Sequence, residues 1–415
     1  MRVTAATGQF LNIAEVDVIG LPPMVDTSDM IFYFPIITMR KIGINKVLKQ
    51  YNKSEVRVLA LVAEAFGGRG GIAQSTRDLM LALSSLPEVA NIDILPRLQP
   101  EPTVCLPAGV RQFSAHRSRL AYALQALWHG AKLKPDIVYC GHAFMAPLAL
   151  MVARMTGARL LCHVHGLEVW QPLSIAKRRA LASYDIVLCV SNYTARKFVE
   201  VTGIDPDRCK VIYNTFDERF TPGNKLSARK KFNLPSNSVV LSTVSRLDPN
   251  QRHKGHDRVI PLVRDLAGVH PNLIYLIAGT GGDQTRLEEL AHDTGAANIV
   301  QFLGFVSDEN LPDLYRASDL YVMPSHGEGF GIAFVEAMAC GTLALGLDQG
   351  GAGDALRNGE LGIAVREADF PNALRTSLDT ATSKISDISE RTNNIFARDQ
   401  FTCRVKSEIK WLMQN

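Results

Sequence analysis

One stretch decides the fold class, residues 320–341, which read Leu320-Tyr-Val-Met-Pro-Ser-His-Gly-Glu-Gly-Phe-Gly-Ile-Ala-Phe-Val-Glu-Ala-Met-Ala-Cys-Gly341. A short apolar run with strand character, 320–323, leads through glycines into a segment with helical character. In an open α/β sheet such a turn lies at the ligand edge, where the free N–H groups of the helix start favour a phosphate. The stretch therefore predicts a Rossmann-like unit whose helix start holds a diphosphate.

Two glutamates flank this helix start. Glu328 precedes the expected helix and Glu336 sits two turns into it, so the two carboxylates cannot share one proton as a close dyad does. We expect Glu328 to reach a polyhydroxylated group beyond the phosphates and Glu336 to hold the ribose behind them. The alternative, two solvated surface glutamates, fits poorly with the surrounding glycine, aromatic and aliphatic residues.

Strand-like runs alternate with helical patterns along most of the chain, which is typical of a parallel sheet wrapped by helices. The expected strands are 56–62, 92–95, 137–140, 159–163, 186–190 and 210–213, then 239–245, 273–278, 299–303, 320–323 and 343–345. A length of 415 residues exceeds what one core usually organises, so the pattern predicts two doubly wound α/β domains.

The domain boundaries follow from this alternation. The sequence predicts an extension of unknown role, a first domain, a second domain and a closing segment, at 1–54, 55–219, 220–394 and 395–415. The polar, turn-rich residues 217–224 mark the linker. Ser307 is expected to cap a helix that begins at Asp308. In the closing segment, an amphipathic helix is expected over 399–412, with Phe401, Val405, Ile409 and Leu412 on one stripe.

The net charge of +4 at pH 7 is too small to indicate a nucleic-acid partner. Its distribution is uneven, because residues 40–53 and 102–135 carry basic residues and no acid, and Lys177-Arg178-Arg179 follows. The seven cysteines include no CxxC pair, which argues against structural zinc and suits reduced thiols in the cytoplasm. We expect no export signal and no transmembrane helix.

Two cations follow the first strand of the second domain. Arg246 can bind phosphate oxygens bidentately, and Lys254 can act as a mobile point charge. Arg252 is the fallback for either residue. Surface ion pairing is the competing interpretation.

The first domain holds a glycine-rich turn and a histidine of interest. Gly68, Gly70 and Ala73 form a G-x-G-x-x-A pattern, but the nearest acid suited to a dinucleotide ribose, Asp93, falls inside a strand. A nicotinamide oxidoreductase therefore stays a minority alternative. His165 follows a strand, where it could bind a sugar hydroxyl or a reacting oxygen, or be purely structural.

Taken in order, these residues resemble the retaining GT-B glycosyltransferases of the family 4 type, over about residues 55–415. The motifs that carry the resemblance are the loop 67–71, His165-Gly-Leu-Glu168, Val211-Ile-Tyr-Asn-Thr-Phe-Asp217, Ser245-Arg246, Lys254-Gly-His-Asp257, Glu328 with Glu336, and Ala339-Cys-Gly-Thr342. The resemblance implies two Rossmann-like domains that face each other across a cleft. It also implies that the closing helix packs back on the first domain.

The resemblance implies roles for individual residues. Arg246 and Lys254 would bind the departing diphosphate, Glu328 with the amides of Phe330 and Gly331 would orient the donor sugar, Glu336 would hold ribose, and His165 would touch the sugar. Gly70, Gly71 and Ile332 complete the expected donor site. No metal and no cofactor are implied. Two departures stand out: the spacing from Arg246 to Lys254 is long, and Asp354 stands where a glutamate is common.

The implied activity is transfer of a hexose from GDP-mannose or a UDP-sugar to a glycan or lipid-linked saccharide, with retention, in polysaccharide or glycolipid biosynthesis. A nucleotide-sugar epimerase, an oxidoreductase and a catalytically silent sugar-nucleotide-binding protein remain alternatives. Leu120, Leu124, Leu127 and Trp128 form a helical stripe set between Arg117, Arg119 and Lys132. The stripe fits either a core-facing helix or a helix on an anionic membrane, which would place a cytoplasmic enzyme on the inner face of the plasma membrane.

Overall fold

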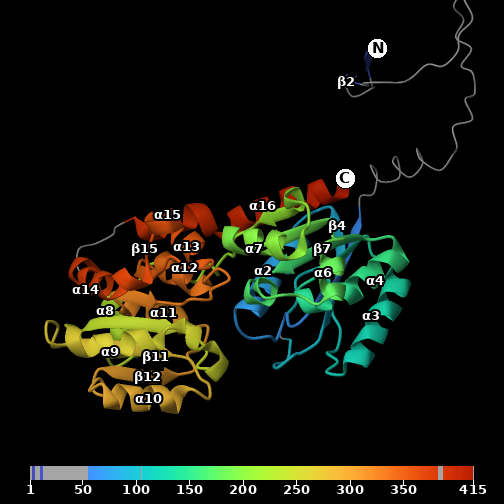
Figure 1. The fold of residues 1–415 in the computed structure, drawn as a ribbon. Coiled ribbons are helices and arrows are strands. Elements are labelled where there is room, and N and C mark those ends of the chain that lie inside the picture. Colours follow the sequence, from blue (N-terminus) through green and yellow to red (C-terminus); the bar gives the residue numbers. More distant parts are fainter. Residues whose placement is uncertain (1, 5–9, 13–54, 104, 382–386, 415) are drawn as a thin grey trace, which may run out of the picture. The chain divides into compact units, whose positions relative to one another are not determined.

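The computed structural model describes residues 2–4, 10–12, 55–103, 105–381 and 387–414 (Figure 1). Residues 1–49 form a unit of their own, in which β1 (Arg2–Thr4) pairs antiparallel with β2 (Phe10–Asn12). Apart from these two strands, the expected extension 1–54, with its basic stretch 40–53, lies outside the described residues. All that follows concerns the second unit, residues 50–415.

The first sheet has seven parallel strands in the order β5-β4-β3-β6-β7-β8-β9. They are β3 (Val56–Val62), β4 (Val89–Pro96), β5 (Val110–Gln112), β6 (Ile137–Cys140), β7 (Arg159–Val164), β8 (Ile186–Cys189) and β9 (Cys209–Val211). Consecutive residues of a central strand enter opposite cores, because side chains alternate across a sheet. Val138 and Cys140 face one cluster, and Ile137 and Tyr139 face the other.

The second sheet has six parallel strands in the order β12-β11-β10-β13-β14-β15. They are β10 (Val239–Val244), β11 (Leu273–Ala278), β12 (Val300–Gly304), β13 (Leu320–Met323), β14 (Leu343–Leu347) and β15 (Ile363–Val365). The chain thus contains two Rossmann-like sheets, as the alternating pattern predicts. β5 and β15, which are short edge strands, were not predicted from the sequence.

Helices cover both faces of each sheet (Figure 1). Those of the first half are α2 (Gly71–Ser84), α3 (Arg119–Leu133), η1 (Ala143–Met145), α4 (Ala146–Thr156), α5 (Leu167–Trp170), α6 (Ile175–Leu181), α7 (Asn192–Thr202) and η2 (Pro206–Arg208). The second half has α8 (Lys225–Lys231), η3 (Pro249–Lys254), α9 (His256–Leu266), α10 (Gln284–Asp293), α11 (Leu311–Ala317), α12 (Ile332–Ala339), α13 (Ala352–Ala355), η4 (Arg357–Gly359), η5 (Glu367–Asp369), α14 (Phe370–Ala381) and α15 (Ile388–Phe396).

The last helix, α16 (Arg398–Gln414), returns to the first sheet and packs against α2. The four residues of the expected stripe are buried, in one cluster with side chains of β3, β4 and α2: Phe401, Val405, Ile409 and Leu412. The predicted amphipathic helix is therefore confirmed.

Two expectations about helices are wrong. Ser307 does not cap a helix at Asp308; its carbonyl accepts the N–H groups of Asn310 and Leu311, and α11 begins only at Leu311. Pro312 in the first helical turn favours this later start, because its fixed φ suits that position.

The core-facing interpretation of the α3 stripe is wrong for three of its four residues. Leu120, Leu124 and Trp128 are exposed, and Leu127 packs half-buried against the core. The side that faces the core carries Tyr122, Ala126, His129 and Gly130. Gly130 lets α4 pack closely there. A methyl group on Gly130 would lie 2.7 Å from a methyl carbon of Val152.

Candidate functional site

The two glycine-rich turns singled out in the sequence lie close together. α2 begins at Gly71 and α12 begins at Ile332. A methyl group on Gly71 would lie 3.7 Å from Cδ1 of Ile332, while the space around Gly70 is open. Two helix starts with free N–H groups therefore adjoin one region, which suits an anionic ligand.

The backbones of the first and second domains touch beside these helix starts. A methyl group on Gly329 would overlap the carbonyl oxygen of His165, and one on Gly166 would lie 2.7 Å from Cα of Gly329. Only glycine fits at position 329 without moving one of the two backbone segments. The predicted histidine and the predicted Glu328 loop are thus brought together.

The predicted diphosphate ligand Lys254 and the predicted sugar ligand Glu328 form an ion pair. The Lys254 side chain is 18 % exposed and that of Glu328 is 9 % exposed. Gly255, with φ of +87°, brings the end of η3 against the carbonyl of Pro324, where no Cβ would fit. The two charges compensate each other in a site with little water.

The two candidate arginines differ in their partners. Arg246 is exposed directly after β10, and its guanidinium has no ion pair or hydrogen bond among the described residues. Arg252 is held by Asp283, at 3.0 Å, and Asp283 also binds Arg286. Arg246 is therefore free to meet an anionic ligand, whereas the fallback Arg252 is already engaged.

Glu336 is the fifth residue of α12, so it lies just over one turn into the helix rather than the expected two. The helix begins later in the chain than the sequence predicts. The Tyr315 hydroxyl donates a hydrogen bond to Oε2 of Glu336, at 2.9 Å. Burial raises the pKa of the Glu336 carboxyl to about 7, and the more distant carboxylates of Asp308, Asp78 and Asp217 act in the same direction.

His165 is held in one tautomer. Its Nε2 lies 3.1 Å from the carbonyl oxygen of Gly141, so Nε2 must carry the proton and Nδ1 is left as an acceptor. Burial lowers the pKa of His165 to about 4, which keeps the ring neutral at pH 7. The fully buried His163 ring lies 4.4 Å from it.

Asp354 takes part in a contact that the sequence did not reveal. Its carboxylate accepts hydrogen bonds from the backbone N–H of Asn192 at 3.1 Å and from the Tyr213 hydroxyl at 3.2 Å. The Tyr213 ring stacks on Phe330, which is buried next to the start of α12. The residue that departs from the family pattern therefore ties the second domain to α7 of the first.

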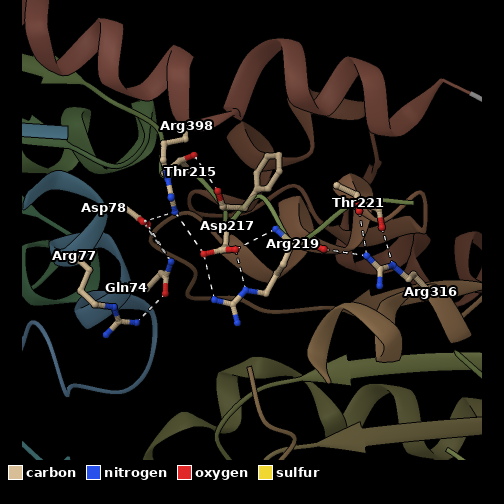
Figure 2. Close-up of polar contacts among 10 residues, drawn as sticks. Gln74, Arg77, Asp78, Thr215, Asp217, Arg219, Thr221, Arg316 and Arg398 are labelled. Carbon is tan, nitrogen blue, oxygen red and sulfur yellow. Dashed lines mark hydrogen bonds and ion pairs between the residues drawn. The ribbon is translucent and has the colours of Figure 1, made fainter. Parts of the chain in front are cut away.

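The chain passes between the two domains twice, near residues 215–217 and near residues 396–398, and we call these segments the domain crossings. A cluster of charges at the two crossings was not predicted from the sequence (Figure 2). The Arg398 guanidinium lies 3.7 Å from Asp78 and 3.6 Å from Asp217. The Thr215 hydroxyl of one crossing donates to the Phe396 carbonyl of the other, at 2.7 Å. Burial raises the pKa of Asp78 to about 6, against the lowering effect of Arg398.

This cluster borders the glycine-rich turn. Gly67 and Gly68 line a cavity of about 290 Å³ together with Asp78, Asp217 and Arg398. The partners lie more than a hundred residues apart in sequence, and no local motif joins them. No sequence signal would have found them without the fold.

Two family models match the chain. Residues 224–384 match the family described as Glycosyl transferases group 1, and residues 69–220 match the one described as Glycosyltransferase Family 4. The two matches together take in most of both sheets.

Among curated proteins, the chain is similar to the D-inositol 3-phosphate glycosyltransferase of Rhodococcus erythropolis, with 34% identity over 226 residues, which is 52% of this chain and 50% of the relative. It is 28% identical to the enzyme of that name from Acidothermus cellulolyticus over 291 residues, 65% of this chain and 63% of the relative. The chain spans about half the length of most of the curated relatives it matches.

Among solved structures, it is similar to Anabaena HepE in complex with UDP, with a TM-score of 0.68 and 20% identity, over 86% of this chain and 100% of that one. The sucrose-phosphate synthase of Thermosynechococcus elongatus gives a TM-score of 0.69 at 19% identity, over 86% and 99%. At these identities the similarity concerns the fold.

Proposed function

Because the chain belongs to the GT-B glycosyltransferases of the group 1 and family 4 type, we propose that it transfers a hexose from a nucleotide sugar to a glycan or lipid-linked saccharide with retention of the anomeric configuration. One observation carries the proposal. The Lys254–Glu328 ion pair lies beside the adjoining starts of α2 and α12, where a donor needs both a cation and a carboxylate.

The diphosphate of the donor binds at the helix starts. Arg246 is free to take phosphate oxygens bidentately, and Lys254 moves from Glu328 to the diphosphate. This exchange releases the Glu328 carboxylate, which accepts hydrogen bonds from hydroxyls of the donor sugar, while the amides of Phe330 and Gly331 complete the sugar site. The ion pair therefore keeps both groups in place and compensated until the donor replaces it.

Glu336 holds the ribose by accepting hydrogen bonds from its hydroxyls. Because burial raises its pKa to about 7, the carboxyl gains a proton easily when no donor is bound. The charged form is the better acceptor. Donor binding is accordingly expected to lower the pKa of Glu336.

Transfer proceeds by attack of the acceptor hydroxyl on the face from which the diphosphate leaves. The bond from C1 to the phosphate oxygen breaks, the bond from C1 to the acceptor oxygen forms, and the hydroxyl proton passes to the departing phosphate. Arg246, Lys254 and the helix starts stabilise the charge that develops on the diphosphate, without a metal. Neutral His165 offers Nδ1 to a sugar hydroxyl.

The donor class is supported by the similar structures, one of which is Anabaena HepE in complex with UDP-glucose. We propose a UDP-sugar or GDP-mannose as donor. The curated relatives are named D-inositol 3-phosphate glycosyltransferases. A small phosphorylated polyol is therefore worth testing beside glycans and lipid-linked saccharides as acceptor.

A ligand screen followed by product analysis tests the proposal. Thermal shift against UDP, GDP, ADP and NAD should show stabilisation by a nucleoside diphosphate, measured with and without EDTA. The product made with the matching nucleotide sugar should have the donor's anomeric configuration by proton NMR. Stabilisation by NAD alone would overturn the transferase proposal, and an inverted product would overturn retention.

A further inference from the structure

Helices α3, α4 and α6 expose large apolar side chains on the first domain. Six of these side chains are between 48% and 70% exposed: Leu120, Leu124, Trp128, Met151, Met155 and Ile175. Leu120, Leu124 and Trp128 follow one another at intervals of four residues, so they line one side of α3. They are too many and too regular to be scattered surface residues.

The three helices pack side by side. α4 lies beside α3, and α6 packs against α4 (Figure 1). A methyl group on Gly130 of α3 would lie 3.2 Å from Cε of Met155. Met155 therefore lies where α4 packs against α3.

The same three helices carry cations and no acid. Residues 102–135, 137–167 and 169–184 contain no aspartate or glutamate. Six exposed basic side chains lie on or next to the helices, and none of them has an ion pair in the described part of the chain: Arg117, Arg119, Lys132, Arg154, Arg178 and Arg179. The Lys132 ammonium lies 4.7 Å from the centre of the Trp128 ring.

We propose that these residues, the α3–α4–α6 surface, dock the protein on an anionic membrane. Apolar side chains flanked by arginine and lysine insert at the boundary between headgroups and acyl chains, while the cations meet the lipid phosphates. Tryptophan next to lysine suits that boundary, because each has an apolar body and a polar end. The charge of the surface is complementary to anionic lipid.

A second copy of the chain is a poorer occupant, because a symmetric contact would place these cations against one another. An acidic soluble protein would match the cations, but it does not account for the row of exposed side chains along α3. Phe144, 39% exposed in η1 between β6 and α4, extends the surface toward the carboxyl end of β6. A membrane-docked enzyme could receive a lipid-linked acceptor at this surface. That step rests on the proposed function, whereas docking itself does not.

Vesicle flotation of the full chain tests docking. The protein should float with phosphatidylcholine vesicles that contain phosphatidylglycerol at low salt, and much less with pure phosphatidylcholine or at high salt. Leu124→Ser combined with Trp128→Ser should lower membrane partitioning about tenfold or more. Val269→Ser is the matched control, since Val269 is 66% exposed on the second domain.

A second variant protects the test against misfolding. Arg178→Gln with Arg179→Gln changes only exposed side chains, and it should weaken flotation while leaving the unfolding temperature and transfer to a short water-soluble acceptor unchanged. Absence of flotation with anionic vesicles at low salt overturns docking, as does unchanged flotation of both variants. A dimer that Trp128→Ser dissociates would assign the surface to a second copy instead. Transfer to the water-soluble acceptor is assayed without lipid. Absence of this transfer in the wild type would therefore count against the proposed function and not against docking.

Discussion

The ammonium group of Lys254 and the carboxylate of Glu328 form an ion pair in which both side chains are largely buried. The two residues are 74 positions apart, and each is proposed to bind a different part of the donor. A bound diphosphate would compete with Glu328 for the lysine. The ion pair is thus a specific target for mutation.

Glu328→Gln should lower kcat by about a hundredfold or more, because the amide can neither hold Lys254 by charge nor accept hydrogen bonds as strongly from the donor sugar. Initial rates over a range of donor concentrations measure the effect. Glu289→Gln is the control, since Glu289 is exposed and has no ion pair among the described residues. Wild-type kcat in Glu328→Gln would remove Glu328 from the site.

Glu336→Gln separates stability from donor binding. Burial raises the pKa of Glu336 from 4.5 to about 7, so the folded state favours the protonated carboxyl. The wild type therefore keeps its full stability below pH 4.5 and loses part of it as the pH rises through 7. The variant should match the wild type near pH 4.5 and gain about 3 kcal/mol relative to it at pH 8.

Chemical unfolding at the two pH values checks this difference, and titration with the nucleotide checks the ribose role. Affinity for the nucleoside diphosphate should fall in Glu336→Gln although the protein is more stable at pH 8. A variant with unchanged affinity would show that Glu336 does not contact the ribose.

The strands were predictable where burial dictates their composition. β6, β11 and β13 match the expected bounds because parallel strands covered on both faces are apolar throughout. The three-residue strands β5 and β15 lie at the edges and are only partly buried, so the neighbouring strand defines them more than their own residues do.

The candidate site was predictable by residue type but not by contact. Glycines, cations and carboxylates at strand ends identify the helix starts, because phosphate binding requires those groups there. Which cation meets which carboxylate depends on loop conformation. The sequence could not tell that Arg252 is held by Asp283, or that Lys254 pairs with Glu328.

His165→Gln tests whether the imidazole acts on the sugar. Burial lowers the pKa of His165 to about 4, so the wild type loses stability as the pH falls from 6.5 toward 4, and the variant should not show this loss. At pH 7 the ring is neutral. If the imidazole binds the donor sugar, its replacement should lower kcat about tenfold to a hundredfold. A change in unfolding temperature with unchanged kcat would assign His165 to structure alone.

Arg398→Met tests the charge cluster at the domain crossings. Without the guanidinium, the buried Asp78 and the nearby Asp217 lose a shared partner (Figure 2). Because the pKa of Asp78 is about 6 even with Arg398 present, the loss in stability should be larger at pH 8 than at pH 5, reaching roughly 1 to 3 kcal/mol. Arg366→Met, at a side chain that is 82% exposed, should change little at either pH. An equal loss at both pH values would contradict a role for the charge.

Gly329→Ala tests the close approach of the two domains. The added methyl group would overlap the His165 carbonyl oxygen, a backbone atom that cannot move without shifting the loop that carries Glu328. We expect a loss of about 1 to 3 kcal/mol in stability from the overlap and a fall of about a hundredfold in kcat/KM from the misplaced carboxylate. Gly282→Ala is the steric control for stability, since its methyl group would meet Pro249 at an ordinary 3.7 Å. Wild-type stability and kcat/KM in Gly329→Ala would mean that the backbones at His165 and Gly329 can separate without consequence. The contact between His165 and the Glu328 loop would then have no part in transfer.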